Sequence, residues 1–150
     1  MIDRSFVESN RAATADLRAL VETLTDADLA ADLGEGWTVS MALAHLAFWD
    51  EWHLARWVHA AGQGELAPPP ADSAVSDWAN AALATTWRSL PPRAAVQLVL
   101  DAAEAVDAYT ADLSDDALGA AGELGGSRGF ERFHHRRDHI DQISRALGRG

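Results

Sequence analysis

Apolar residues recur at helical spacing along almost the whole of this 150-residue chain. In the first segment they stand three, four or seven positions apart, at Phe6, Ala13, Leu17, Leu20 and Leu24. This spacing places them on one face of an α-helix. The alternation of period two that marks a half-buried β-strand is absent throughout. The pattern therefore predicts an all-α fold, and 150 residues suit a single domain over 1–150.

Breaks in the pattern divide the chain into four helical regions. The expected regions are about 3–24, Thr38 or Ser40 to about residue 59, 71–113, and about 130–147. Pro91 and Pro92 interrupt the third region, which is therefore either one kinked helix or two helices. Helices of about 20 residues are about 30 Å long, as in a four-helix bundle.

The connections have compositions that favour loops and turns. Residues 65–70 end in three prolines and predict a long connection between the second and third helices. Residues 119–129 contain five glycines and predict a flexible loop. Residues 25–28 begin a short turn that carries Leu29 and Leu33.

The charge of the chain limits its partners. Its formal net charge is −11, and all twelve basic residues are arginines. Nucleic acid and anionic membranes would repel such a surface. The absence of cysteine excludes disulfides, thiolate ligands and a cysteine nucleophile. Without a signal peptide or a long apolar run, the expected location is the cytoplasm.

Three histidines have the spacing of a metal site. His135 and His139 are four residues apart on the last predicted helix, which places both imidazoles on one face. His45 lies on the second predicted helix. If these helices face each other, three nitrogen ligands converge and leave coordination positions open, as in catalytic metal sites. The alternative is that they are partly exposed surface histidines, which we also expect of His53, His59 and His134, with His134 as a fallback ligand.

Other side chains beside His45 are candidates for a substrate pocket. Trp49, Trp52 and Arg56 share a helical stripe with His45, next to the apolar stripe. The two tryptophans could line an apolar pocket, and Arg56 could bind a carboxylate or lie in solvent. Asp50 falls on the apolar stripe and needs a partner. Arg4 and Arg11 are candidates for an ion pair, which we favour, and an imidazole that binds the metal is the alternative.

Two motifs resemble the DinB-like four-helix bundle superfamily. They are GWTVS followed by LAHLAFWD, at 36–50, and HRRDHIDQI at 135–143. The superfamily includes DinB proteins, bacillithiol transferases and mycothiol-dependent maleylpyruvate isomerases. The resemblance implies an up-down-down-up bundle with His45, His135 and His139 as metal ligands. Some relatives carry Glu at the position of His135. Zinc and nickel both suit imidazole ligands.

The resemblance favours a metal-dependent enzyme that acts on a small electrophile. We expect a thiol S-transferase or a thiol-dependent isomerase, with mycothiol as the thiol because the composition indicates a GC-rich genome. The nucleophile would then be a metal-bound water or the thiolate of that thiol. The alternative is a non-catalytic bundle, metal-binding or metal-free, that acts through a homodimer or a protein partner. A pocket beside the histidines would favour the enzyme, whereas a sealed site would favour the alternative.

Overall fold

The computed structural model describes residues 1–64, 73–124 and 127–149. Within these residues the chain is mostly helical, which confirms the predicted fold class in outline. The elements are α1 (Ser5–Glu22), α2 (Asp26–Leu29), β1 (Asp32–Gly34), β2 (Trp37–Thr38), α3 (Val39–Gln63), α4 (Ser73–Ser89), α5 (Pro92–Ala111), α6 (Asp115–Glu123), the 3-10 turn η1 (Ser127–Gly129) and α7 (Phe133–Ala146).

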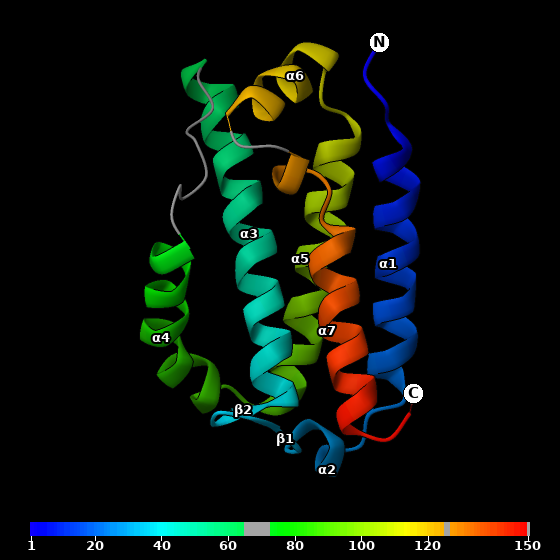
Figure 1. The fold of residues 1–150 in the computed structure, drawn as a ribbon, viewed down its shortest axis with the longest axis vertical. Helices are drawn as coiled ribbons and strands as arrows, with labels where there is room; N and C mark the ends of the chain where they lie inside the picture. The colour runs from blue at the N-terminus through cyan, green and yellow to red at the C-terminus, as the bar shows by residue number, and fades with distance from the viewer. Residues whose placement is uncertain (65–72, 125–126, 150) are drawn as a thin grey trace.

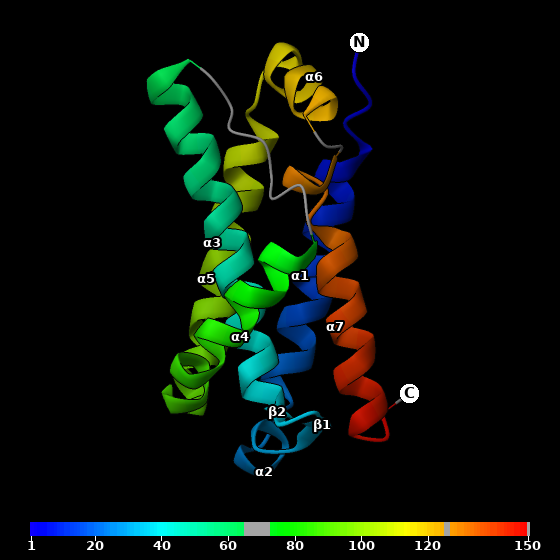
Figure 2. The same ribbon diagram turned by 60° about the vertical axis from the view of Figure 1, so that its left-hand side comes forward.

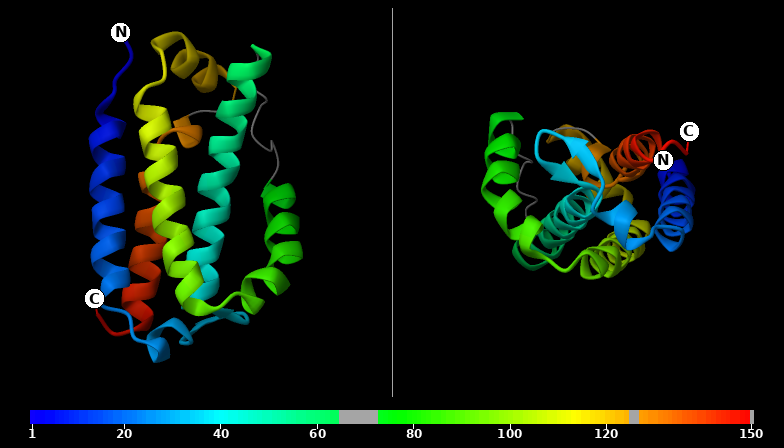
Figure 3. Two further views of the ribbon diagram at one scale, coloured as in Figure 1. Left: turned by 180° about the vertical axis from the view of Figure 1, so that it is seen from behind. Right: turned by 90° about the horizontal axis from the view of Figure 1, so that it is seen from below.

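The long helices α1, α3, α5 and α7 lie side by side (Figure 1). Helices α1 and α7 run from the upper end to the lower end, and α3 and α5 run in the opposite direction (Figures 1 and 2). The view from below shows these helices around a common centre, with α4 outside α3 (Figure 3). Helix α3 packs mainly against α5, and α7 packs mainly against α1. Helices α3 and α7 thus face each other across the bundle where the histidines lie.

Local sequence signals set the ends of α3. The Thr38 side chain accepts a hydrogen bond from the backbone N–H of Met41 and caps the first turn. At the other end Gly64 adopts φ +78°, the left-handed conformation that terminates many helices and favours glycine. The helix extends to Gln63, four residues beyond the expected end at residue 59.

The described residues of region 71–113 form two helices instead of one kinked helix. Helix α4 ends at Ser89 and α5 begins at Pro92, so they are separate helices. Pro92 occupies the first turn of α5, where its missing N–H leaves no helical hydrogen bond unmade. Residues 71 and 72, and the connection predicted over 65–70, lie outside the described residues.

Two sequence predictions were wrong. The short strands β1 and β2 pair antiparallel between α2 and α3, although no strand was predicted. The two strands contain five residues in all, too few to show a period of two. Residues 119–123 form the second half of α6 instead of a loop, and 127–129 form η1. Residues 125 and 126 lie outside the described part of the chain.

The interior has two apolar clusters with a polar layer between them. The larger cluster fills the lower part of the bundle and includes Leu17, Leu43, Leu46, Val99 and Ile143. The smaller one comprises Phe6, Trp57, Leu118, Ala121 and Phe130. Between them along the helices lie the buried polar side chains Asn10, Thr14, Asp50, His53 and Arg136. The candidate site adjoins this layer.

No helix among the described residues is both long and apolar enough to cross a lipid bilayer.

Candidate metal centre and adjoining pocket

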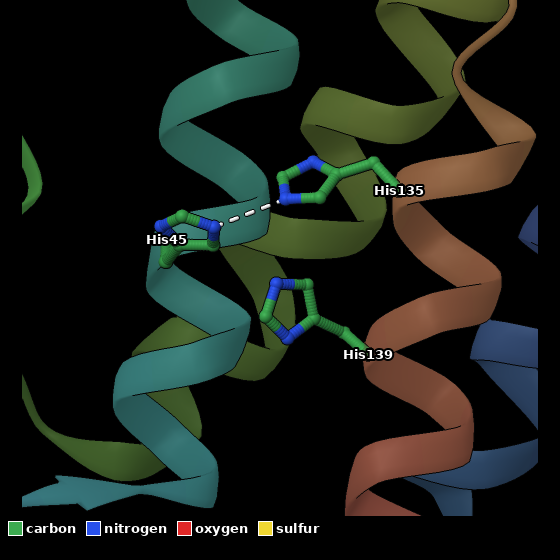
Figure 4. Close-up of side chains that lie close together, drawn as sticks. All are labelled: His45, His135 and His139. Atoms are coloured by element: carbon green, nitrogen blue, oxygen red, sulfur yellow. Dashed lines mark hydrogen bonds between the residues drawn. The ribbon is translucent and has the colours of Figure 1, made fainter. Parts of the chain in front are cut away.

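His45, His135 and His139 converge between α3 and α7, each pointing toward the other two (Figure 4). One nitrogen of each ring lies within 4.8 Å of the corresponding nitrogens of the other two. The closest pair is His45 Nε2 and His135 Nε2, which are 3.0 Å apart. Two nitrogens bound to one cation at about 2.0–2.1 Å are at most about 4.2 Å apart, so small side-chain rotations would suffice for shared ligation.

Aromatic rings hold the His45 side chain in place. Trp37 and Trp87 pack edge-on against its imidazole, with centroid distances of 5.4 and 5.5 Å. Only 7% of His45 is exposed, and its Nδ1 is buried without a hydrogen-bond partner among the described residues. An unpaired buried nitrogen is unfavourable. Nε2 is the nitrogen that faces the other two rings, so a cation bound there would leave Nδ1 unpaired (Figure 4).

In His135 and His139, a hydrogen bond to Nδ1 shows which ring nitrogen carries the proton. The side-chain oxygen of Gln142 accepts from His139 Nδ1 at 2.8 Å, which leaves Nε2 of that ring as its lone-pair nitrogen. Arg132 Nη2 lies 3.2 Å from His135 Nδ1. Because a guanidinium can only donate, His135 Nδ1 accepts, and the neutral ring carries its proton on Nε2. His135 Nε2 can therefore bind a cation only after the ring proton moves to Nδ1, which requires Arg132 to turn away.

Burial keeps all three imidazoles uncharged. Burial, together with the neighbouring His139, lowers the pKa of His45 to about 4. Burial also lowers the pKa of His135, with the Arg132 guanidinium acting in the same direction, and it lowers the pKa of His139. Near neutral pH the three rings are thus unprotonated, which is the form that binds metal.

A buried ionic network fixes the segment that carries His135. The Asp50 carboxylate accepts from Arg132 Nε at 2.7 Å and from Arg136 Nη2 at 3.0 Å. Arg136 is fully buried, and its Nη1 donates to Thr14 Oγ1 and to Asp107, each at 2.9 Å. Two carboxylates and two guanidiniums balance in charge, as burial of ions requires. The expected ion pair of Asp50 exists, but Arg4 and Arg11 as its partners were wrong.

A pocket of about 920 Å³ opens beside the histidines. His45 and His135 form part of its wall, whereas His139 does not. The other residues that line it come from α3, from α4 and from the segment around η1 and α7: Trp49, Trp52, His53, Ser76, Asn80, Ser127, Arg128, Glu131, Arg132, His134 and Asp138. A cavity of this volume is large enough for a small-molecule ligand. The histidine cluster is therefore open to the pocket on one side.

The predicted pocket residues divide into two groups. Trp49 and Trp52 line the pocket, with Trp49 Nε1 donating to Asn80 Oδ1 at 3.0 Å. Arg56 is not among the lining residues. Its guanidinium lies over the Trp52 ring, 4.9 Å from the centroid, and its Nη1 is 3.4 Å from His53 Nδ1. Arg56 thus supports two residues of the pocket wall from behind.

The remaining histidines occupy three different environments. His59 is exposed, as expected. His134 is also exposed, at the edge of the pocket, with Nε2 3.8 Å from Glu131 Oε2. His53 was expected at the surface but is 93% buried, since only 7% of it is exposed, and it lines the pocket.

Sequence reasoning missed Arg132, Arg136 and Asn10. Arg136 stands between the histidines of the second motif, and a charge one residue from a buried ligand pair is a weak signal that was available. Asn10 interrupts the apolar stripe of α1, and the pattern alone does not show its role. Its side chain accepts from the backbone N–H of Phe133 and donates to the carbonyl of Phe130. Those two bonds fix the start of α7, which begins three residues later than predicted.

The family model described as the mycothiol maleylpyruvate isomerase N-terminal domain matches residues 10–139. The chain belongs to this family. The match covers the first motif and all three histidines, and it confirms the resemblance to the DinB-like superfamily, of which this domain is a member. Comparisons with curated proteins and with solved structures gave no match.

Proposed function

We propose that this protein is a metal-dependent enzyme that joins a mycothiol-type thiol to a small electrophile, or uses the thiol to isomerise that electrophile. The single observation that carries the proposal is the convergence of His45, His135 and His139 beside a pocket of about 920 Å³, whose wall includes His45 and His135. The family match supports mycothiol as the thiol. A sealed histidine cluster would have favoured a non-catalytic bundle, and this one is open.

The residues present fit a divalent cation such as zinc or nickel. His45, His135 and His139 would hold it, with imidazole nitrogens that burial keeps unprotonated. The bond from His139 Nδ1 to Gln142 agrees with this assignment. A bound zinc or nickel ion would supply Lewis acidity, which lowers the pKa of a thiol or a water molecule.

The residues of the chain itself would bind and orient the reactants. Trp49 and Trp52 supply apolar wall against which an electrophile can pack. Asn80, Ser76 and Ser127 offer amide and hydroxyl groups for a polar thiol compound. Asp50 holds Arg132, which in turn contacts His135, so the ionic network positions one wall of the pocket.

We also propose that residues 1–150 form one DinB-like bundle domain with the up-down-down-up order of that superfamily. The opposite directions of α1 and α7 relative to α3 and α5 support this (Figure 1). The long second-to-third connection of the family would lead into α4.

A specific observation keeps a second function in view. Trp78 is 69% exposed and lies one turn after Val75, which is also exposed, on α4. Exposed apolar residues of this size occur at protein interfaces. A non-catalytic bundle that acts through a dimer or a protein partner would use such a surface.

The deciding experiment combines metal analysis with a thiol-conjugation assay. Purified protein should contain about one zinc or nickel ion per chain, and loaded protein should accelerate conjugation or isomerisation of an electrophile with mycothiol. Bacillithiol and glutathione serve as competing thiols. If loaded protein shows no rate above buffer with any thiol across a range of electrophiles, the enzyme proposal loses its support and the partner-binding function replaces it.

A further inference from the structure

His53 is a buried polar residue of the pocket wall that the proposed metal centre does not use. It lies eight residues after His45 on α3, about 12 Å further along the helix axis. Its ring is 93% buried, because only 7% of the residue is exposed, and it lines the same pocket as His45 and His135. A buried imidazole facing a pocket is a candidate for contact with a ligand.

The environment of His53 fixes its orientation and its proton. Trp52 packs edge-on against the imidazole at a centroid distance of 5.0 Å. Arg56 Nη1 faces His53 Nδ1 at 3.4 Å, and a guanidinium can only donate. Nδ1 therefore accepts, which places the ring proton on Nε2. The N–H of Nε2 is the group that this side chain can offer to a ligand.

Close backbone packing holds the ring from another side. Gly129 lies directly against the ring: if it carried a Cβ, that atom would be 3.9 Å from His53 Nδ1 and 3.7 Å from the Trp57 side chain. Trp57 Nε1 also donates a hydrogen bond to the Gly129 carbonyl at 2.9 Å. The 3-10 turn η1 is thus fastened against α3 next to His53. The residue before Gly129 is Arg128, which is exposed and lines the pocket.

The electrostatic surroundings exclude a role for His53 as an acid or base near neutral pH. Burial, together with the nearby guanidiniums of Arg132 and Arg56, lowers its pKa to about 2. An effective general base has a pKa near the working pH. His53 is instead a neutral hydrogen-bond donor at every pH at which the protein would work.

We propose that His53 donates a hydrogen bond from Nε2 to a carboxylate oxygen of the electrophile, and that this residue selects carboxylate-bearing molecules with a flat apolar body. Arg128, an exposed residue in the segment beside His53, lines the pocket and can pair with an anion, whereas Arg132 already pairs with Asp50. Two carboxylates also line the pocket: Glu131, which accepts from the Ser127 hydroxyl, and Asp138, which is exposed on α7. Trp49 and Trp52 provide the apolar surface. This inference names the substrate class of the proposed function and rests on it.

Binding of benzoate to the purified protein tests the proposal without any thiol or turnover. Benzoate combines a flat apolar ring with one carboxylate, and benzyl alcohol is its uncharged control. By titration calorimetry, wild-type protein should bind benzoate more tightly than benzyl alcohol. His53→Leu should weaken benzoate binding about ten-fold, the effect of removing one hydrogen bond to a charged group, and should leave benzyl alcohol unchanged. His53→Gln, which keeps an N–H donor, should restore most of the affinity.

The controls separate this proposal from structural effects and from the proposed function. His59→Leu changes an exposed histidine on the same helix and should bind benzoate like the wild type. In the wild type, the ¹⁵N resonance of His53 Nε2 should shift on addition of benzoate, a readout that remains if His53→Leu does not fold. An equal affinity of His53→Leu and wild type for benzoate, or an Nε2 resonance that benzoate leaves unmoved, overturns the proposal. A failed thiol assay alongside a positive benzoate result would reject only the enzyme.

Discussion

Each histidine of the triad stands in a different bonding situation, and this matters for substitution. His45 is nearly enclosed by tryptophans, His139 is oriented by Gln142, and His135 is held by Arg132. None of the three carries a helix cap or fills the centre of an apolar cluster. Loss of one ring should therefore affect ligand binding more than folding.

We predict that His45→Ala and His139→Ala each lower the affinity for zinc or nickel more than about 100-fold. Loss of a residue that only supports a ligand already costs about 10–100-fold, and loss of the ligand itself should exceed that. Competition with a chromogenic chelator would measure the affinity, and circular dichroism should show an unchanged helical signal. His59→Ala is the matched control on α3. Wild-type affinity in both triad variants would contradict the ligand assignment.

A second prediction concerns the buried imidazoles and acid. The folded pKa is about 4 for His45 and about 2 for His53, and it is lowered for His135 and His139, against about 6.5 in the unfolded chain. As the pH falls below about 6.5, the unfolded chain binds protons that the folded protein does not. The free energy of unfolding of the chelator-treated protein should then fall by up to about 1.4 kcal/mol per pH unit for each imidazole.

Urea unfolding at several pH values between 7.5 and 5.5 measures this slope. His53→Gln removes one of the four imidazoles. It should reduce the slope by about 1.4 kcal/mol per pH unit, which corresponds to one proton fewer bound on unfolding. A slope of less than one proton in the wild type would show that these rings titrate normally in the folded protein.

At the scale of the elements, α7 is joined to the bundle by ions as much as by apolar contacts. On this helix only Arg136 and Ile143 are fully buried, whereas Phe133, Ile140 and Leu147, which the helical pattern indicates as its apolar stripe, are only half-buried. Arg136 reaches Asp50 on α3, Asp107 on α5 and Thr14 on α1. One guanidinium thus connects α7 to the other three long helices.

We predict that Asp50→Ala destabilises the protein by about 3–5 kcal/mol. The substitution leaves two buried guanidiniums, Arg132 and Arg136, and only one carboxylate of the network, Asp107. One buried positive charge is then uncompensated, which costs about this much. Urea unfolding at pH 7.5 would measure the change. Arg93→Ala removes an ion pair with Asp26 that is exposed on both sides, and it should change little. A small effect of Asp50→Ala would mean that water reaches the network.

The same elements show how far the sequence could predict this structure. Helical spacing was sufficient for α1 and for the course of α3, although α3 ends four residues later than expected. The spacing of His135 and His139 put these two on one face, and only the family resemblance placed His45 with them. Helix α6 was missed because Gly119 and Gly122 outweighed its capping residue Ser114 and the acidic first turn. The burial of Arg136 depends on partners from three distant segments, and the periodicity of one helix contains no information about them.

At the scale of the whole molecule, the site lies where a polar layer separates two apolar clusters. The network of Asp50, Arg136 and Asp107 interrupts the core at the height of the pocket. Polar interior of this kind contributes less to stability than apolar packing of equal volume. A ligand that binds both α3 and α7 should therefore stabilise the entire bundle, because it joins two helices that are far apart in the sequence.

We predict that the melting temperature rises by roughly 5–10 °C when zinc or nickel is present at about 100 times its dissociation constant, and falls again with chelator. Binding to the folded state alone contributes about 2.7 kcal/mol at that concentration, and a domain of this size gains about 2–4 °C per kcal/mol.

The acid limit of this metal effect follows from the same imidazoles. Because the folded pKa of His45 is about 4, protons compete with a cation for this ring only as the pH approaches that value. The increment in melting temperature should thus be complete near pH 8 and should be lost between about pH 6 and 4, whereas exposed histidine ligands would lose it near pH 6.5. Differential scanning calorimetry with metal and with chelator at each pH would measure the increment. Equal melting temperatures under both conditions at pH 8 would remove the metal from the proposed function, because a cation shared by α3 and α7 cannot bind the folded bundle without stabilising it.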